Sequence, residues 1–201
     1  MKVEIYKKYG LIFCLPLFLA SCLGNAPPVQ FYTLTSLAGD GAAFSQKNSG
    51  EKISLGIGPL EIPKMLDRSQ IVTRSGENRL HLAEFHRWGG SLSDDFLRVL
   101  AENLAVLLHS DQVLSYPWRD FSVPRYCLRL KLQRFDAGAG EKAVLAMTWA
   151  LTDTKGGTVL KRSFLQEKVA GGEYTDIVAA QSRLLLRFSM EIAGEISARR
   201  R

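Results

Sequence analysis

The sequence has few cysteines and histidines, and its N-terminal apolar run is too short to span a bilayer. There are three cysteines and three histidines in 201 residues. The apolar run covers residues 11–20 and is interrupted by Pro16, whereas a transmembrane helix needs about 20 apolar residues. This stretch therefore does not predict a membrane-spanning helix.

The first 21 residues have the layout of a secretory signal peptide. Three lysines precede the apolar run, and small residues follow it; this arrangement is typical of such signals. The segment leads into four residues that resemble a lipobox, namely Leu19, Ala20, Ser21 and Cys22. Residues 1–21 are therefore predicted to be removed and the Cys22 thiol to be acylated. The alternatives are an ordinary signal with a cysteine nearby by chance, or an uncleaved anchor.

Acylation would leave a single free cysteine in the mature chain. Cys14 lies in the removed segment, so only Cys127 remains, and an intramolecular disulfide is excluded. The fold must then depend on its hydrophobic core. The 180 residues from position 22 onward (201 − 21) fit one domain or a small pair. We expect a Pro-containing tether at 22–30 and a single domain at 31–201, with a net charge near +4 (6 − 2).

Apolar periodicity predicts an α+β fold. Leucines recur at helical spacing over 91–109, and a second helical stripe covers 175–198. Alternating or β-branched segments predict strands at 31–35, 53–57, 71–74, 79–84, 112–115, 126–133, 143–152 and 158–169. The strand at 53–57 is expected to end at Pro59. The order of strands, helix, strands, helix predicts a mostly antiparallel sheet with two long helices packed on one face.

The patterns of known catalytic and metal sites are missing from the sequence. It has no nucleophile elbow, no H-E-x-x-H and no phosphate loop, and the glycine-rich stretch 137–142 predicts a hairpin turn. His81 and His86 fall at odd separation in a strand, which argues against shared metal ligation. Cys127 has basic neighbours that could lower its pKa, but without a histidine partner a small half-buried residue is favoured. Scattered charge and export argue against nucleic-acid binding. We therefore predict a protein that is not an enzyme and has no cofactor or metal.

The region from 55 to 108 carries a specific set of motifs. They are Gly58-Pro59, Leu66-Asp67-Arg68-Ser69-Gln70-Ile71-Val72-Thr73-Arg74, Ala83-Glu84-Phe85-His86-Arg87-Trp88 and Ala101-Glu102-Asn103-Leu104. With Tyr32-Thr33-Leu34 and the closing helix, they resemble the auxiliary lipoproteins of ABC-type transport systems, the Pqi-type membrane-integrity lipoproteins. The resemblance covers nearly the whole mature chain. Ser69 replaces the family's usual proline, and Gly89-Gly90 stands where Ala-Glu is common.

The resemblance implies a non-catalytic outer-membrane component of a system built on MCE proteins, which moves lipids or other hydrophobic molecules across the periplasm. An MCE-domain protein is the expected partner, and a homo-oligomer is compatible with this role. The predicted partner interface consists of Leu66, Asp67, Arg68, Gln70, Arg74, Phe85 and Trp88. The alternative for these residues is a structural one, in which charged groups cap turns and aromatic groups fill the core.

Two further points concern location and alternatives. Leu23 follows the cysteine, and it is not the aspartate that retains lipoproteins at the inner membrane. We therefore expect an outer-membrane lipoprotein that faces the periplasm.

The alternative function is a free-standing lipoprotein that binds a hydrophobic ligand itself, which would require a lined cavity. A lipid hydrolase would need a nucleophile and a base, and no such set is evident.

Overall fold

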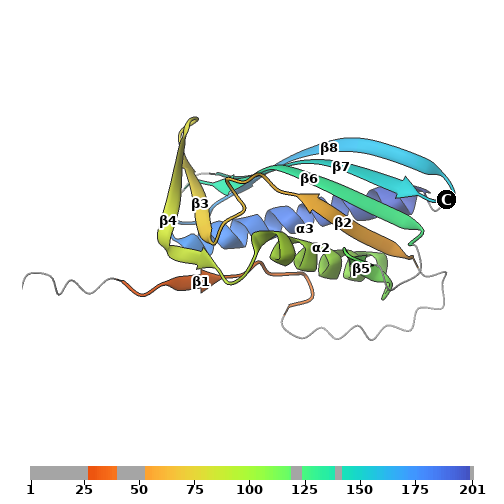
Figure 1. The fold of residues 1–201 in the computed structure, drawn as a ribbon, viewed down its shortest axis with the longest axis horizontal. Coiled ribbons are helices and arrows are strands. Elements are labelled where there is room, and N and C mark those ends of the chain that lie inside the picture. Colours follow the sequence, from red (N-terminus) through yellow and green to blue (C-terminus); the bar gives the residue numbers. More distant parts are fainter. Residues whose placement is uncertain (1–26, 40–52, 119–123, 139–141, 200–201) are drawn as a thin grey trace, which may run out of the picture.

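The structure is a computed structural model that describes residues 27–39, 53–118, 124–138 and 142–199. It consists of one large sheet and two long helices that lie beside it (Figure 1). The predicted signal peptide, the lipobox residues Leu19, Ala20 and Ser21, and Cys22 lie outside the described residues. No helix in the described part is both long enough and apolar enough to cross a membrane.

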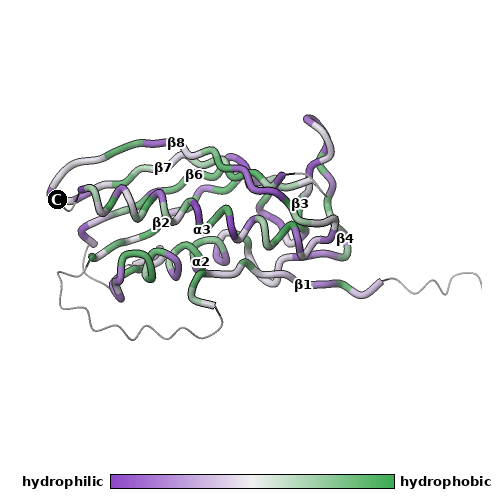
Figure 2. The backbone as a smooth tube through the Cα atoms, turned by 180° about the vertical axis from the view of Figure 1, so that it is seen from behind, coloured by the Kyte–Doolittle hydropathy of each residue, from purple (hydrophilic) through white to green (hydrophobic). Residues whose placement is uncertain are grey.

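Both predicted helices are confirmed. They are α2 (Leu92–Leu108) and α3 (Tyr174–Arg199). The Ser91 hydroxyl accepts a hydrogen bond from the Asp94 backbone N–H (3.4 Å) and caps the first turn of α2. Each helix buries one side and exposes the other, and Figure 2 shows this as alternating hydrophobic and hydrophilic turns along α2.

The strands make one eight-stranded sheet. They are β1 (Gln30–Tyr32), β2 (Leu55–Glu61), β3 (Gln70–Ser75), β4 (Arg79–Trp88), β5 (Val113–Ser115), β6 (Tyr126–Ala137), β7 (Lys142–Asp153) and β8 (Gly157–Lys168). Strand β6 pairs with β7 along its whole length, so β2 and β3 share its other edge. Beyond these, β5 pairs with β2, β4 with β3, β1 with β4 and β8 with β7.

The prediction of a mostly antiparallel sheet is wrong. The sheet is mixed: four pairings are parallel (β1–β4, β2–β5, β2–β6 and β3–β6) and three are antiparallel (β3–β4, β6–β7 and β7–β8). The antiparallel pairs are sequence neighbours joined by short turns. The parallel pairs join strands far apart in the chain, and alternation within a strand carries no information about such partners.

Two strand ends also differ from expectation. Strand β2 continues past Pro59 to Glu61, because a register shift between Ile57 and Leu60 removes the need for a ladder hydrogen bond at the proline. Gly58 just before it has φ +111°, and a Cβ there would lie 2.7 Å from the Cβ of Tyr116. Strand β1 ends at Tyr32 rather than at 35, because the following backbone bonds to helix side chains instead.

The core lies between the sheet and the helices. One hydrophobic cluster joins residues of β2, β3, β4, β6, β7, α2 and α3. Phe96 of α2 meets Phe135 of β6 edge to face at 5.4 Å between ring centroids, and Trp149 of β7 meets Phe188 of α3 at 6.5 Å. The alternate side chains of β6 to β8 point away from this core, and neither of the two described helices packs on that face (Figure 1).

Candidate functional site

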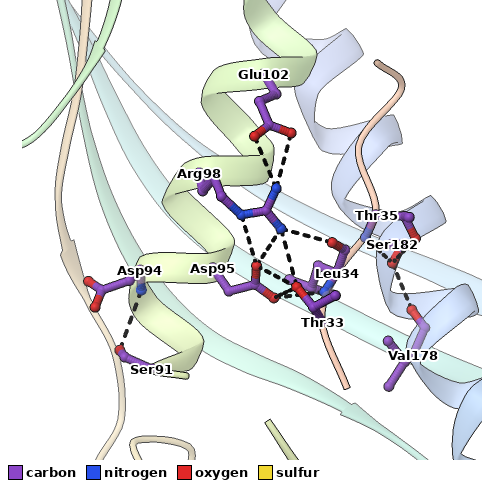
Figure 3. A network of polar contacts seen from close by, with 10 residues as sticks. All are labelled: Thr33, Leu34, Thr35, Ser91, Asp94, Asp95, Arg98, Glu102, Val178 and Ser182. Carbon is purple, nitrogen blue, oxygen red and sulfur yellow. Dashed lines mark hydrogen bonds and ion pairs between the residues drawn. The ribbon is translucent and has the colours of Figure 1, made fainter. Parts of the chain in front are cut away.

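The segment that follows β1 crosses both helices and is held by their polar side chains (Figure 3). We call residues 33–37 with their partners Asp95, Arg98, Asn103 and Ser182 the N-terminal clamp. The Asp95 carboxylate accepts hydrogen bonds from the Leu34 backbone N–H (2.7 Å) and from the Thr33 hydroxyl (3.0 Å). The Leu34 side chain is buried in the core. One residue of this segment is therefore held by both its backbone and its side chain.

Arg98 closes the same side of the clamp. Its guanidinium donates to Asp95 (2.6 Å), to Glu102 (3.0 Å) and to the backbone carbonyl of Leu34 (3.0 Å). Partial burial opposes the charge of Arg98, but the hydrogen bonds to the two carboxylates outweigh it and raise the pKa of the arginine. The cation therefore stays charged and satisfies a carbonyl that no strand partner reaches.

The second half of the clamp rests on α3 and on the buried side of α2. The Thr35 backbone N–H donates to the Ser182 hydroxyl (3.1 Å), and the Leu37 N–H donates to Oδ1 of Asn103 (2.7 Å). Asn103 is fully buried and donates from Nδ2 to the Ser189 hydroxyl (3.3 Å). A buried amide inside a helix needs partners, and the clamp supplies one of them.

An aromatic cluster lies where β1 joins the sheet. The Tyr32 hydroxyl lies 2.7 Å from Nδ1 of His86 on the neighbouring strand β4. In the parallel β1–β4 pair, His86 is opposite Gln30, and Tyr32 is opposite Trp88. The His86 ring stacks on Tyr174 at the start of α3, with centroids 4.0 Å apart. Burial is the largest cause of a raised pKa for Tyr32. His86 is thus a packing residue that joins β1, β4 and α3.

The predicted partner interface divides into buried and accessible residues. Leu66 and Trp88 are 3% and 4% exposed and belong to the core. They can hold the surrounding residues in place but offer a partner almost no surface. Phe85 is half-buried and Asp67 is exposed. Whether this region binds a partner stays a prediction.

The charged and polar members of that interface have different surroundings. Arg74 pairs with Asp136 of β6 (3.3 Å), which ties the β3–β4 hairpin to the centre of the sheet. Gln70 and Arg68 are half-buried, and Nε of Arg68 is buried without a hydrogen-bond partner among the described residues. Arg74 therefore has a structural role. Asp67 and Arg68 lie in the loop before β3, and Gln70 is the first residue of β3.

The other chemistry-bearing residues have ordinary surroundings. His81 is exposed and His86 is packed between two tyrosines, so the structure does not bring the two histidines together. Cys127 is half-buried, as predicted. Burial raises the pKa of its thiol despite the opposing effect of Arg129, so the basic neighbours do not activate it. Among the described residues, no group of three or more potential metal ligands gathers.

A depression of about 320 Å³ lies on the surface beside α2. Its lining includes Leu97, Ala101 and Tyr116 but also three charged side chains, those of Asp94, Arg98 and Glu102. Sites for apolar ligands are mainly lined by hydrophobic side chains with few polar groups. This open depression, in which three of the seven lining residues are charged, lends no support to the alternative of a protein that binds a hydrophobic ligand by itself.

The clamp and the motifs around it coincide with a known family. The model of the ABC-type transport auxiliary lipoprotein component matches residues 32–193, which includes every clamp residue. The chain belongs to this family. Membership makes it an auxiliary lipoprotein component of a transport system, as the motif resemblance implied. The search of curated proteins gave no match.

Solved structures share the fold at low sequence identity. A crystal structure of an uncharacterized protein has a TM-score of 0.70 and 16% identity, covering 85% of this chain and 99% of that one. A protein from Xanthomonas campestris, in a family of unknown function, has a TM-score of 0.64 and 14% identity, covering 84% and 94%. A PelC dodecamer from Paraburkholderia phytofirmans is more distant, with a TM-score of 0.39, 13% identity and coverage of 70% and 90%.

Sequence reasoning found the clamp only in part. Tyr32-Thr33-Leu34 and Ala101-Glu102-Asn103-Leu104 are among the motifs that resemble the family, and they contain part of the clamp. What was missed is that these residues meet. The available signal was the i, i+3 and i, i+4 spacing of the two acids around Arg98, which predicts an ion-pair cluster but not what it binds.

Proposed function

We propose that the chain is a non-catalytic docking subunit of an ABC/MCE-type system that transports lipids or other hydrophobic molecules between the two membranes and so supports membrane integrity. In this proposal, acylated Cys22 anchors it in the outer membrane and the domain faces the periplasm. Family membership supports the auxiliary role. The observation that carries the proposal is the N-terminal clamp, because it ties the segment just after the tether to both helices.

The clamp matters for a docking subunit because mechanical force passes through such a subunit, from its lipid anchor to its protein partner. A pull on the tether reaches β1 first, and β1 has only three residues paired to β4. Without the clamp, such a short strand would peel from the sheet. With it, the load spreads through Asp95 and Asn103 into the helices and core. A free-standing ligand-binding protein would have less need of such reinforcement.

The proposed partner is an MCE-domain periplasmic protein that contacts the accessible part of the predicted interface. Asp67 and Arg68 lie in the loop before β3, Gln70 begins β3, and Phe85 lies in β4. Strands β3 and β4 lie at the same end of the molecule as β1 (Figure 1). The β7–β8 turn with Lys155 lies at the opposite end. A partner that approaches the anchored end would therefore meet the former residues and not the latter.

Site-specific photocrosslinking in membranes tests this proposal. A photoreactive residue at Asp67 is expected to capture an MCE-domain protein, identified by mass spectrometry, in cells that contain the whole transport system. The same residue at Lys155, which is also exposed, serves as the matched control. Capture of an MCE protein at neither position, with the partner present, would count against the docking role.

Acylation has its own test. Radiolabelled or alkyne-tagged palmitate is expected to enter the wild-type chain and not the Cys22→Ser chain. Separation of the two membranes on a density gradient then reports which of them holds the labelled protein. Label in Cys22→Ser, or fractionation with the inner membrane, would contradict the proposed anchor or its proposed location.

A further inference from the structure

Of the segments that the structure describes, none lies over the face of β6, β7 and β8 opposite the helices (Figure 1). The helix-facing side chains of β7, such as Leu145, Met147 and Leu151, are buried, whereas those between them point the other way and stay partly accessible. The paired register places alternate residues of the three strands in rows across this outer face. We call these outward residues of β6–β8 the open face.

Two large apolar side chains protrude from the open face. Leu160 and Phe164 of β8 are 71% and 62% exposed. Their partners across the β7–β8 pair are Ala150 and Ala146, whose side chains are too small to shield them. Arg162 lies between them on the same side of β8, so the outward row of this strand alternates apolar and basic side chains.

The open face is also basic. Arg129 and Lys131 of β6 alternate outward, and Arg162 of β8 lies in the same row as Lys131, with one β7 residue between them. Lys131 pairs with Glu61 (3.1 Å), but both side chains are more than 60% exposed, so the pair is weak. Among the described residues, Arg129 and Arg162 have no carboxylate partner.

The helix side of the molecule has a different balance. Arg98 pairs with two carboxylates, Arg183 and Arg187 pair with Glu167, and Lys161 and Arg199 share Glu195. These cations on the helix side are thus neutralised locally, whereas Arg129 and Arg162 of the open face have no such partner among the described residues and can meet an outside anion. Together with Phe164 and Leu160, this pattern fits a surface that is both anionic and apolar just below its outer layer.

We propose that the open face rests on an anionic phospholipid leaflet, with Arg129, Arg162 and Lys131 against the headgroups and Phe164 and Leu160 in the interfacial layer. This inference rests on the proposed anchoring through Cys22. Basic residues beside inserted apolar side chains are the usual composition of surfaces that lie on membranes.

The tether is long enough to allow this orientation. Strands β4 and β3 separate β1 from the Ala137 end of β6, where Thr73 and Ala137 pair, and three strand spacings amount to about 14 Å. The eight residue steps from Cys22 to Gln30 can reach about 28 Å when extended. The tether therefore spans the step from β1 to the near end of the open face, so an acyl group on Cys22 and this face can meet the same leaflet. Arg129 lies about 26 Å further along β6, and the acyl chains would hold this weakly binding surface close to the leaflet.

Vesicle binding without the acyl anchor tests the proposal. The mature chain from residue 22, carrying Cys22→Ser, is expected to co-sediment with vesicles of phosphatidylethanolamine and phosphatidylglycerol. It should not do so when phosphatidylcholine replaces the phosphatidylglycerol. Arg129→Gln with Arg162→Gln is expected to lower the partition coefficient roughly 30-fold, the effect of two cations at an anionic surface. Phe164→Ala should lower it several-fold.

A matched control removes two charges elsewhere. Lys64 and Lys155 are exposed and lie off the open face, so Lys64→Gln with Lys155→Gln should change binding much less. An equal fall in both double variants would show a net-charge effect and overturn the proposal, and so would failure of the parent chain to bind anionic vesicles. Thermal melts of each variant confirm that it is folded.

The remaining outcome separates a lipid surface from a protein surface. If Arg129→Gln with Arg162→Gln abolished crosslinking of the transport partner but left vesicle binding intact, the open face would be a protein interface and the lipid proposal would fail. The vesicle test contains neither partner nor acyl chain. Its failure therefore leaves the docking proposal standing, and failure of the crosslinking test leaves the vesicle result standing.

Discussion

The most direct test of the N-terminal clamp is removal of the Asp95 carboxylate. In Asp95→Ala, the Leu34 backbone N–H loses its acceptor at 2.7 Å and the Thr33 hydroxyl loses its partner at 3.0 Å. Arg98 keeps Glu102 and the Leu34 carbonyl. The change therefore removes one side of the segment's attachment and leaves the helix itself intact.

The expected cost follows from the burial of each group. A hydrogen bond to a charged group contributes about 1.5–3 kcal/mol, and a donor left unsatisfied costs about as much. The exposed Thr33 hydroxyl can turn to water, so most of the loss comes from the Leu34 N–H. We expect the free energy of unfolding to fall by about 2–3 kcal/mol, which lowers Tm by roughly 4–12 °C for a chain of this size.

Urea unfolding and hydrogen exchange together check this prediction. Asp95→Asn keeps an acceptor for the Leu34 N–H and should lose about half as much stability. Asp67→Ala is the control, because Asp67 is exposed and its side chain makes no ion pair or hydrogen bond among the described residues, and such surface changes stay within about 0.5 kcal/mol. If Asp95→Ala lost no more stability than Asp67→Ala, or kept full protection of the Leu34 amide, the clamp would not stabilise this segment.

Three further predictions concern the core, pH and the free thiol. Asn103→Ala should lower the free energy of unfolding by about 2–3 kcal/mol in urea titrations. The change leaves the Leu37 N–H without its acceptor and removes the donor to the Ser189 hydroxyl, which keeps its bond to the Leu185 carbonyl. Substitution of an exposed α3 residue by alanine should not lower it. The hydrogen bond from the Lys155 N–H lowers the pKa of Asp153, although burial of the carboxylate opposes this shift. The ionised Asp153 therefore stabilises the fold above the unfolded-state pKa, and this stabilisation is lost as pH falls through the lower folded-state pKa. Asp153→Asn should therefore flatten the acid limb of stability against pH, and an unchanged limb would refute the assignment. Burial raises the pKa of Cys127, so a maleimide should label the folded chain at pH 8 more slowly than the unfolded chain.

Local pattern predicted most of the elements. Helix α2 follows from leucines at helical spacing and from the Ser91 cap, both of which act within a few residues of the chain. Strands β6 and β7 follow from strict alternation, and the structure buries the apolar set of each. The hairpins β3–β4 and β7–β8 follow because a short turn leaves adjacent strands one way to pair.

Pairing across long sequence separations was not predictable in the same way. Strand β2 lies parallel to β6, about 70 residues later in the chain, and nothing in either strand's alternation identifies the other. The same limit applies to interface residues. Leu66 and Trp88 belong to motifs that resemble those of the family, yet they are buried; the identity of an apolar residue does not tell a core position from an exposed contact.

The sequence by itself determined the proposed anchor, the helices, most strands and, through its motifs, the family. These features depend on residue spacing and identity along a continuous stretch. Only the tertiary structure decided that the sheet is mixed, that Thr33 to Leu37 is held by Asp95, Asn103 and Ser182, and that Arg129, Arg162 and Phe164 share one open face. Each of these depends on residues that are brought together only when a single core closes around both helices and the sheet.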